Sequence, residues 1–142
     1  MRGPNPQSQF KNLGVVTVPF GGKTEQEAFH PGVDIANESG TPVPALADGV
    51  VSKVDGGHAP GENNFGNTVE LKDLQGNTHQ FHHLQDIMVK PGQQVKKSQP
   101  VATMGASGAT YSPSGKDPSN LDVRIVTAYG KYLNPMTFLR NL

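Results

Sequence analysis

The stretch SNLDVRIV, Ser119–Val126, alternates apolar and polar side chains with a period of two. Leu121, Val123 and Ile125 share one face, and the other face carries Asn120, Asp122 and Arg124. Such alternation is typical of a half-buried β-strand. An amide, a carboxylate and a guanidinium in a row on the second face indicate more than a solvated surface. The stretch therefore predicts both a strand and a polar site, or the remnant of one.

The rest of the chain favours an all-β fold. Seventeen Gly and twelve Pro in 142 residues leave little room for long helices, and short β-branched runs recur between them. Helical turns are expected only in Thr24–Phe29 and Pro135–Leu142. The expected strands are Gly14–Pro19, Gly49–Val54, Asn67–Lys72, Thr78–Leu84, Pro100–Met104 and Leu121–Thr127.

Length and composition limit the organisation and the partners. A chain of 142 residues predicts one domain, 14–142, preceded by a flexible N-terminal arm, 1–13. A formal net charge of zero, without a long basic run, argues against nucleic acid and anionic membranes as partners. Because the chain has no cysteine, any metal ion must be held by His, Asp or Glu.

The segment FHPGVDIAN, Phe29–Asn37, contains the first chemical motif. His30 and Asp34 are four residues apart, and imidazole nitrogen and carboxylate oxygen are both good zinc ligands. A His and an Asp at this spacing often occur by chance, so the motif needs its context.

That context is the order of the sequence blocks. HPGVDIAN is followed by TPVPALADGVV, FGNTVELKD, HQFHHLQDIMVKPGQQVKKSQPVATMGASG, SNLDVRIV and NPMTFL. Over about 16–139 this order resembles the lysostaphin-type (LytM-type) zinc endopeptidases. The resemblance implies a small antiparallel β-sandwich or barrel of the duplicated hybrid motif kind. It also implies bacterial peptidoglycan peptides as ligand and zinc as cofactor.

The resemblance assigns roles to three residues. His30 and Asp34 match the first two zinc ligands, and His83 of the HHL triplet matches a catalytic His that assists the zinc-bound water. Alternation along THQFHHL places His83 and His82 on opposite faces, so only one is expected to face the groove. We choose His83, and we expect three other imidazoles to be solvated: His58, His79 and His82.

The chain departs from the family pattern in the stretch SNLDVRIV, where the family usually has HLHFE. Asn120 stands at the position of a catalytic His, and Asp122 at that of the third metal ligand. Arg124 is a candidate for a groove ion pair with Asp122 or Asp34. Two alternatives follow. The domain is either a catalytically degenerate binding or structural module with weak or absent zinc, or an active zinc endopeptidase with Asp122 as third ligand.

A third class receives less support. VKPGQQVKKSQPVATM resembles the hairpin of biotinyl and lipoyl carrier domains, but Lys96 and Lys97 in it are better explained as framework. The N-terminal MRGPNPQSQF lacks the apolar stretch of a signal peptide. We therefore expect synthesis in the cytoplasm, followed by association with a phage particle or tail or by release on lysis. Virion proteins and other cell-wall-lytic proteins are then the expected protein partners.

Two geometric expectations test this interpretation. His30, Asp34, His83 and Asp122 should lie in one groove. The loops His58–Asn64 and Thr110–Ser119 should form its walls, because connections flank the open face of a sandwich.

Overall fold

A computed structural model describes residues 13–23, 28–59, 64–108, 110 and 119–142. The expected arm, 1–13, lies outside this range except for Leu13, which is buried. Most of the expected helical turn at 24–29 and most of both expected groove loops also lie outside it. Those predictions stay untested.

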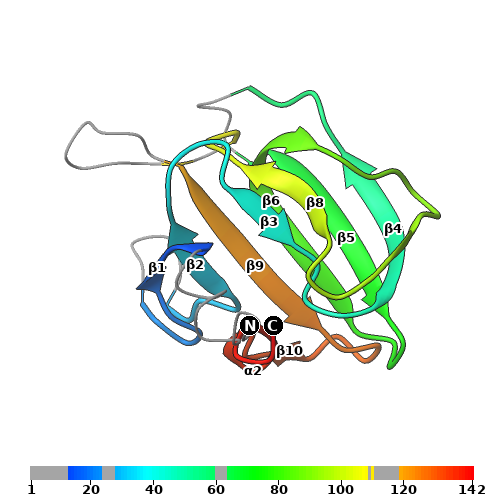
Figure 1. Cartoon of the computed structure of the whole chain (residues 1–142). Coiled ribbons are helices and arrows are strands. Elements are labelled where there is room, and N and C mark those ends of the chain that lie inside the picture. The colour runs from blue at the N-terminus through cyan, green and yellow to red at the C-terminus, as the bar shows by residue number, and fades with distance from the viewer. Residues whose placement is uncertain (1–12, 24–27, 60–63, 109, 111–118) are drawn as a thin grey trace, which may run out of the picture.

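Ten strands account for most of the described residues (Figure 1). Their bounds are β1 Val15–Val18, β2 Val33–Ala36, β3 Pro42–Pro44, β4 Gly49–Asp55, β5 Asn67–Asp73, β6 Thr78–Ile87, β7 Gln94–Val95, β8 Pro100–Met104, β9 Asn120–Val126 and β10 Tyr132–Leu133. The six strands expected from the sequence are all present, with each end within three residues of its expected position. The four that were missed, β2, β3, β7 and β10, have two to four residues each, which is too short for a periodic pattern.

The strand pairings are all antiparallel, so the all-β antiparallel prediction is confirmed. The main path runs β1-β2-β9-β6-β5-β4-β7, while β10 pairs with β9 and β3 pairs with β8. The long strand β6 joins two layers, because it pairs with β5 and β9 and then, from Leu84 onward, with β8. The paired strands β3 and β8 lie in front of the main sheet in Figure 1.

The hydrophobic core lies between these layers. Alternate residues of β9 and β6, among them Val123 and Phe81, are fully buried and pair across the two strands. Val43 of β3 and Ala102 of β8 close the core from the other side. Since the odd-numbered residues of β9 fill the core, its even-numbered residues form the opposite face of the sheet.

The chain ends in the short helix α2, Met136–Leu139, within the predicted helical segment Pro135–Leu142. Phe138 of α2 contacts His79 edge-on, with ring centroids 4.9 Å apart. His79 is fully buried and bonds Asp73 at 2.9 Å, so the expectation that it is solvated is wrong. Within the described ranges, no helix is long and apolar enough to span a membrane.

Candidate active-site groove

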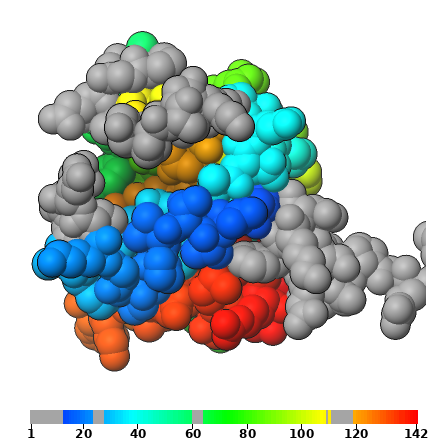
Figure 2. All heavy atoms as spheres, turned by 90° about the vertical axis from the view of Figure 1, so that its left-hand side faces the viewer, coloured from blue at the N-terminus to red at the C-terminus, as the bar shows by residue number. Residues whose placement is uncertain are grey.

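The polar face of β9 lies between β2 and β6, and the strand register aligns three of its neighbours. Asp34 of β2 pairs with Asp122 of β9, and Asp122 pairs with His82 of β6. Directly opposed residues in antiparallel strands have their side chains on the same face, about 5 Å apart at Cβ. In Figure 2, seen from the β1–β2 side, orange atoms of β9 show behind the blue atoms of those strands.

His30 joins this row from the turn before β2. Its backbone is held by two hydrogen bonds, from Gly21 N to the His30 carbonyl and from His30 N to the Gly22 carbonyl, both 2.8 Å. Gly32 allows the turn to approach β9, because a Cβ there would lie 2.4 Å from the Val123 carbonyl oxygen. As a result, His30 is buried and its Nε2 lies 3.0 Å from Asp34 Oδ1.

Ligand atoms of His30, Asp34 and Asp122 all lie within 4.8 Å of one another. This is the trio that the family resemblance names as metal ligands. The structure thus places the three residues together, although a distance alone does not assign them a metal.

Asp122 is occupied by a neighbour on its own strand. Arg124 Nε donates to Asp122 Oδ1 at 3.0 Å, and Arg124 Nη2 donates to Oδ2 at 2.9 Å. Both side chains are more than nine-tenths buried, and the guanidinium carbon lies 4.7 Å from the centre of the Phe65 ring. Of the two carboxylates named as partners for Arg124, Asp122 therefore accepts this two-pronged, charge-assisted pair.

The donor set fits zinc only in part. One imidazole and one carboxylate, from His30 and Asp34, are ordinary zinc ligands. The third donor, Asp122, has an Arg124 donor on each of its oxygens, so a metal ion would have to displace a hydrogen bond of a buried ion pair. A set of one His and two carboxylates is also harder than typical zinc sites.

His82 lies on the groove face, opposite Asp122, where alternation alone puts it. It is only 5% exposed, so the expectation that it is solvated is wrong. Its ring stacks on Phe65 with centroids 4.2 Å apart, and its Nδ1 lies 2.9 Å from Thr68 Oγ1. Burial lowers the pKa of His82 to about 4, although the Asp122 carboxylate acts in the opposite direction. The imidazole is consequently neutral near pH 7.

We chose His83 for the groove by assuming regular alternation along β6. The structure shows that the alternation is interrupted at His83. Its φ of 65° and the register shift between Asn67 and Val69 interrupt the β5–β6 ladder at this point. The two adjacent imidazoles consequently lie near each other, with centroids 6.5 Å apart, and both are near Phe65. The sequence offers no signal for this irregularity.

The His83 ring is held in one tautomer. Its Nδ1 lies 2.8 Å from the Ser107 carbonyl oxygen, and a carbonyl can only accept. Nδ1 therefore carries the proton, and Nε2 of the neutral ring carries the lone pair. This arrangement suits a histidine that takes up or releases a proton at Nε2.

Asn120 begins β9 and is partly buried. It pairs with Ala36 of β2, and its backbone N–H donates to the Gly105 carbonyl at 3.1 Å. Its amide can donate a hydrogen bond but exchanges no proton near neutral pH. Asn120 can thus form hydrogen bonds with a ligand but cannot act as a general acid or base.

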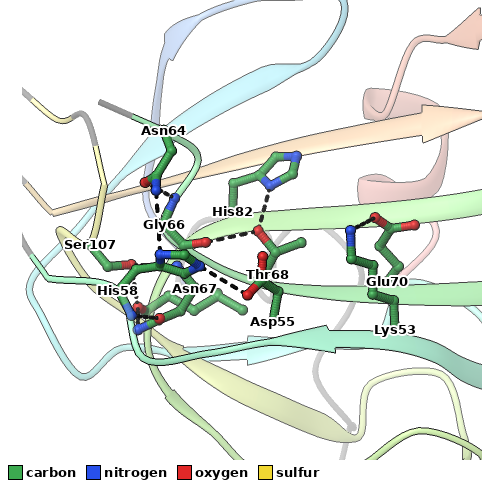
Figure 3. Close-up of polar contacts among 11 residues, drawn as sticks. Lys53, Asp55, His58, Asn64, Gly66, Asn67, Thr68, Glu70, His82 and Ser107 are labelled. Carbon is green, nitrogen blue, oxygen red and sulfur yellow. Dashed lines mark hydrogen bonds and ion pairs between the residues drawn. The ribbon is translucent and has the colours of Figure 1, made fainter. Parts of the chain in front are cut away.

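A pocket of about 300 Å³ lies on the same face, over β4, β5, β6 and β9. Figure 3 shows the polar residues of this region, where His58 bonds Asp55 at 2.9 Å and the His82 ring bonds the Thr68 hydroxyl. His58 and Asn64, the described ends of one expected groove loop, both line the pocket. Of the strand residues that form its floor, the sequence had indicated only Arg124 as a groove residue.

Residues 28–135 match the family described as Peptidase family M23. The peptidoglycan DD-endopeptidase ShyC of Vibrio cholerae is 35% identical over 63% of this chain and 20% of its own length. The murein hydrolase activator NlpD of Escherichia coli K12 is 30% identical over 80% of this chain and 27% of its own. The chain thus spans about a quarter or less of these relatives.

Solved structures share the fold, among them the two that follow. Lysostaphin from Staphylococcus simulans has a TM-score of 0.71 and 25% identity, covering 93% of this chain and 51% of that one. A variant catalytic domain of the prophage-encoded M23 protein EnpA from Enterococcus faecalis has a TM-score of 0.68 and 26% identity, covering 86% and 88%. Since the family match also spans most of the strands that build the groove, the chain belongs to peptidase family M23.

Proposed function

We propose that this domain binds peptidoglycan peptides in its groove but hydrolyses them poorly or not at all. It acts as a binding or structural module in the process of cell-wall attachment or lysis. The family membership supports the peptidoglycan ligand, and the relatives include both an endopeptidase and a hydrolase activator by name.

The observation that carries the proposal is the pair between Arg124 and Asp122. It places a fixed positive charge beside Asp122, the candidate third metal ligand, and it engages both oxygens of that carboxylate. Asn120 removes a proton-transfer group as well, and loss of a general acid or base typically costs 10²–10⁴-fold in rate. Binding of a peptide requires neither a metal ligand nor a proton-transfer group.

The experiment is a sedimentation assay with purified peptidoglycan, combined with measurement of released peptide. We expect the protein to sediment with peptidoglycan while release stays near the background without protein. Absence of sedimentation would contradict the binding role, and release that depends on added protein would contradict the degenerate site.

The second candidate is an active zinc endopeptidase with Asp122 as third ligand. Two observations favour it: the clustering of His30, Asp34 and Asp122 and the fixed tautomer of His83. When bound, zinc would supply a Lewis acid and an activated water. Stoichiometric zinc in protein purified without chelator, together with peptide release abolished by His30→Ala, would establish this alternative.

We also propose delivery by a phage particle or by host lysis. The resemblance to a prophage-encoded M23 protein is compatible with this. Mass spectrometry of purified virions from a producing strain tests it. The protein should be recovered with the particles, and recovery only from culture medium without particles would contradict the proposal.

A further inference from the structure

A second row of polar residues crosses the groove face, parallel to the row that contains Asp122. The register pairs Arg124 of β9 with Gln80 of β6, Gln80 with Glu70 of β5, and Glu70 with Lys53 of β4. All four line the pocket of about 300 Å³. The row is therefore a continuous polar floor across four strands.

The side chains along this floor differ in whether they already have hydrogen-bond partners. Arg124 is engaged by Asp122. No hydrogen bond of the Gln80 side-chain amide is found among the described residues. Lys53 Nζ lies 3.9 Å from Glu70 Oε2, which is too far for a hydrogen bond, and the Lys53 side chain is 57% exposed. Gln80 and Lys53 can thus bind a ligand without breaking an internal bond.

The walls of the pocket add apolar contact and a buried polar atom. The rings of Phe65 and Tyr132 both line it and are 47% and 40% exposed. His82 also lines the pocket, and its Nε2 is buried without a partner among the described residues. A volume of about 300 Å³ is at the lower end for ligand sites. It suits a few residues of an extended peptide.

We propose that this pocket is a subsite for a carboxylate-bearing residue of the bound peptide, with Lys53 as the residue that determines specificity. Lys53 pairs with the carboxylate, Gln80 bonds a peptide group, and Phe65 and Tyr132 contact the apolar part. This rests on the proposed function and specifies which part of the ligand is recognised.

The charges in the pocket favour a carboxylate over an ammonium group as ligand. Of its two acidic residues, Glu70 is only 19% exposed and lies next to Lys53, while Asp55 already accepts a bond from His58 at 2.9 Å. Figure 3 shows both acidic groups with a basic partner next to them, at opposite sides of Thr68. Lys53 is the most exposed of these charged groups.

The test uses soluble peptidoglycan fragments in two forms, with free carboxylates and with carboxylates amidated by carbodiimide and ammonia. Dissociation constants are measured by calorimetry at low salt. The unmodified protein should bind the free form about fivefold more tightly, which is the strength expected of an exposed ion pair. In Lys53→Met this preference should fall to near one. The matched control Lys90→Met, an exposed lysine outside the pocket, should keep it.

Glu70→Gln gives a result of opposite sign. Removing the anion beside Lys53 should tighten binding of the free-carboxylate form two- to threefold. Weaker binding would overturn the proposal, because it would indicate that Glu70 binds a cationic group of the ligand. Equal binding of both forms by the unmodified protein, or a preference that survives Lys53→Met, would also overturn it. If neither form binds at all, the proposed function itself fails, so the two failures are distinguishable.

Discussion

Arg124 is the residue on which the proposed loss of zinc chemistry in this groove depends. Its guanidinium forms two parallel hydrogen bonds with Asp122 in a site from which water is largely excluded, and Phe65 covers it. Burying two charges is costly, and their mutual attraction offsets that cost only while both are present. The pair is therefore better explained by its effect on the groove than by a gain in stability.

The first prediction concerns this pair. Arg124→Met should lower the free energy of unfolding by about 3–5 kcal/mol, because it leaves the Asp122 carboxylate buried without a counter-charge. Urea denaturation measures it. The matched control is Lys53→Met, which removes the cation of an exposed pair in the same sheet and should cost about 1 kcal/mol or less. Equal losses in both variants would show that Asp122 is stabilised by something else.

The second prediction follows from His82. Its pKa is about 4 in the folded protein, against about 6.5 for an unperturbed histidine. Below pH 6.5 the unfolded chain therefore binds a proton at His82 that the folded chain does not bind. The contribution of His82 to the free energy of unfolding is thus complete above pH 6.5 and is lost as the pH falls toward 4. The loss should be on the order of 3 kcal/mol.

Urea titrations from pH 7.5 to pH 4.5, with chelator present, test this prediction. His82→Gln should reduce the dependence of the unfolding free energy on pH. It should not abolish it, because burial also lowers the pKa of His79. Identical slopes in the variant and the unmodified protein would refute the role of His82.

At the scale of elements, the groove depends on an irregular junction between β5, β6 and Ser107. His83 N donates to the Phe65 carbonyl at 2.8 Å, and Asn67 N donates to Ser107 Oγ at 2.9 Å. Gly66 lies within this junction at a φ of +69°. The junction thus sets where Phe65 and both imidazoles lie.

The third prediction is that Gly66→Ala disrupts this junction. A Cβ at Gly66 would lie 2.4 Å from the Ser107 carbonyl group, in addition to the strain of a positive φ. Gly76→Ala is the matched control, since Gly76 has a φ of +86° and open space around it. We expect Gly66→Ala to lower the free energy of unfolding by about 2 kcal/mol or more beyond the control, as measured by urea denaturation. Equal losses would mean that the contact with Ser107 relaxes at no cost.

At the scale of the whole molecule, the fold and the chemistry of the groove occupy opposite faces of the same strands. The core face of β9 is fully buried, whereas its groove face differs from the family pattern at Asn120, Asp122 and Arg124. Because the apolar core uses only the first face, residues on the second face can change without opening that core. Restoring the family residues should accordingly leave the fold intact.

The fourth prediction is that the triple variant Asn120→His, Asp122→His and Arg124→Glu gains zinc affinity, since an imidazole replaces a carboxylate and the competing cation is removed. Zinc at a hundred times its dissociation constant should then raise the unfolding free energy by about 2.7 kcal/mol, and the melting temperature accordingly. Adding His30→Ala to the triple variant should abolish the response. If zinc does not change the unfolding free energy of the triple variant, His30, Asp34 and position 122 do not form a zinc site.

The sequence alone determined six of the ten strands that the structure describes, the antiparallel all-β class and the family, because alternation and the order of turn-rich blocks are local properties of the chain. It also indicated His30, Asp34 and Asp122 as a group, and the structure places them within 4.8 Å. The short strands β2, β3, β7 and β10 were missed, since two to four residues carry no period.

Only the tertiary structure decided what the groove contains. The sequence left open whether Asp34 or Asp122 is the partner of Arg124. In the structure Arg124 bonds Asp122, while His30, in the turn before β2, bonds Asp34. It could not indicate the buried position of His82 or the polar floor from Arg124 to Lys53, because both arise from cross-strand register. Register depends on bulges and on pairing between residues far apart in the chain, and a period of two along one strand contains no information about either.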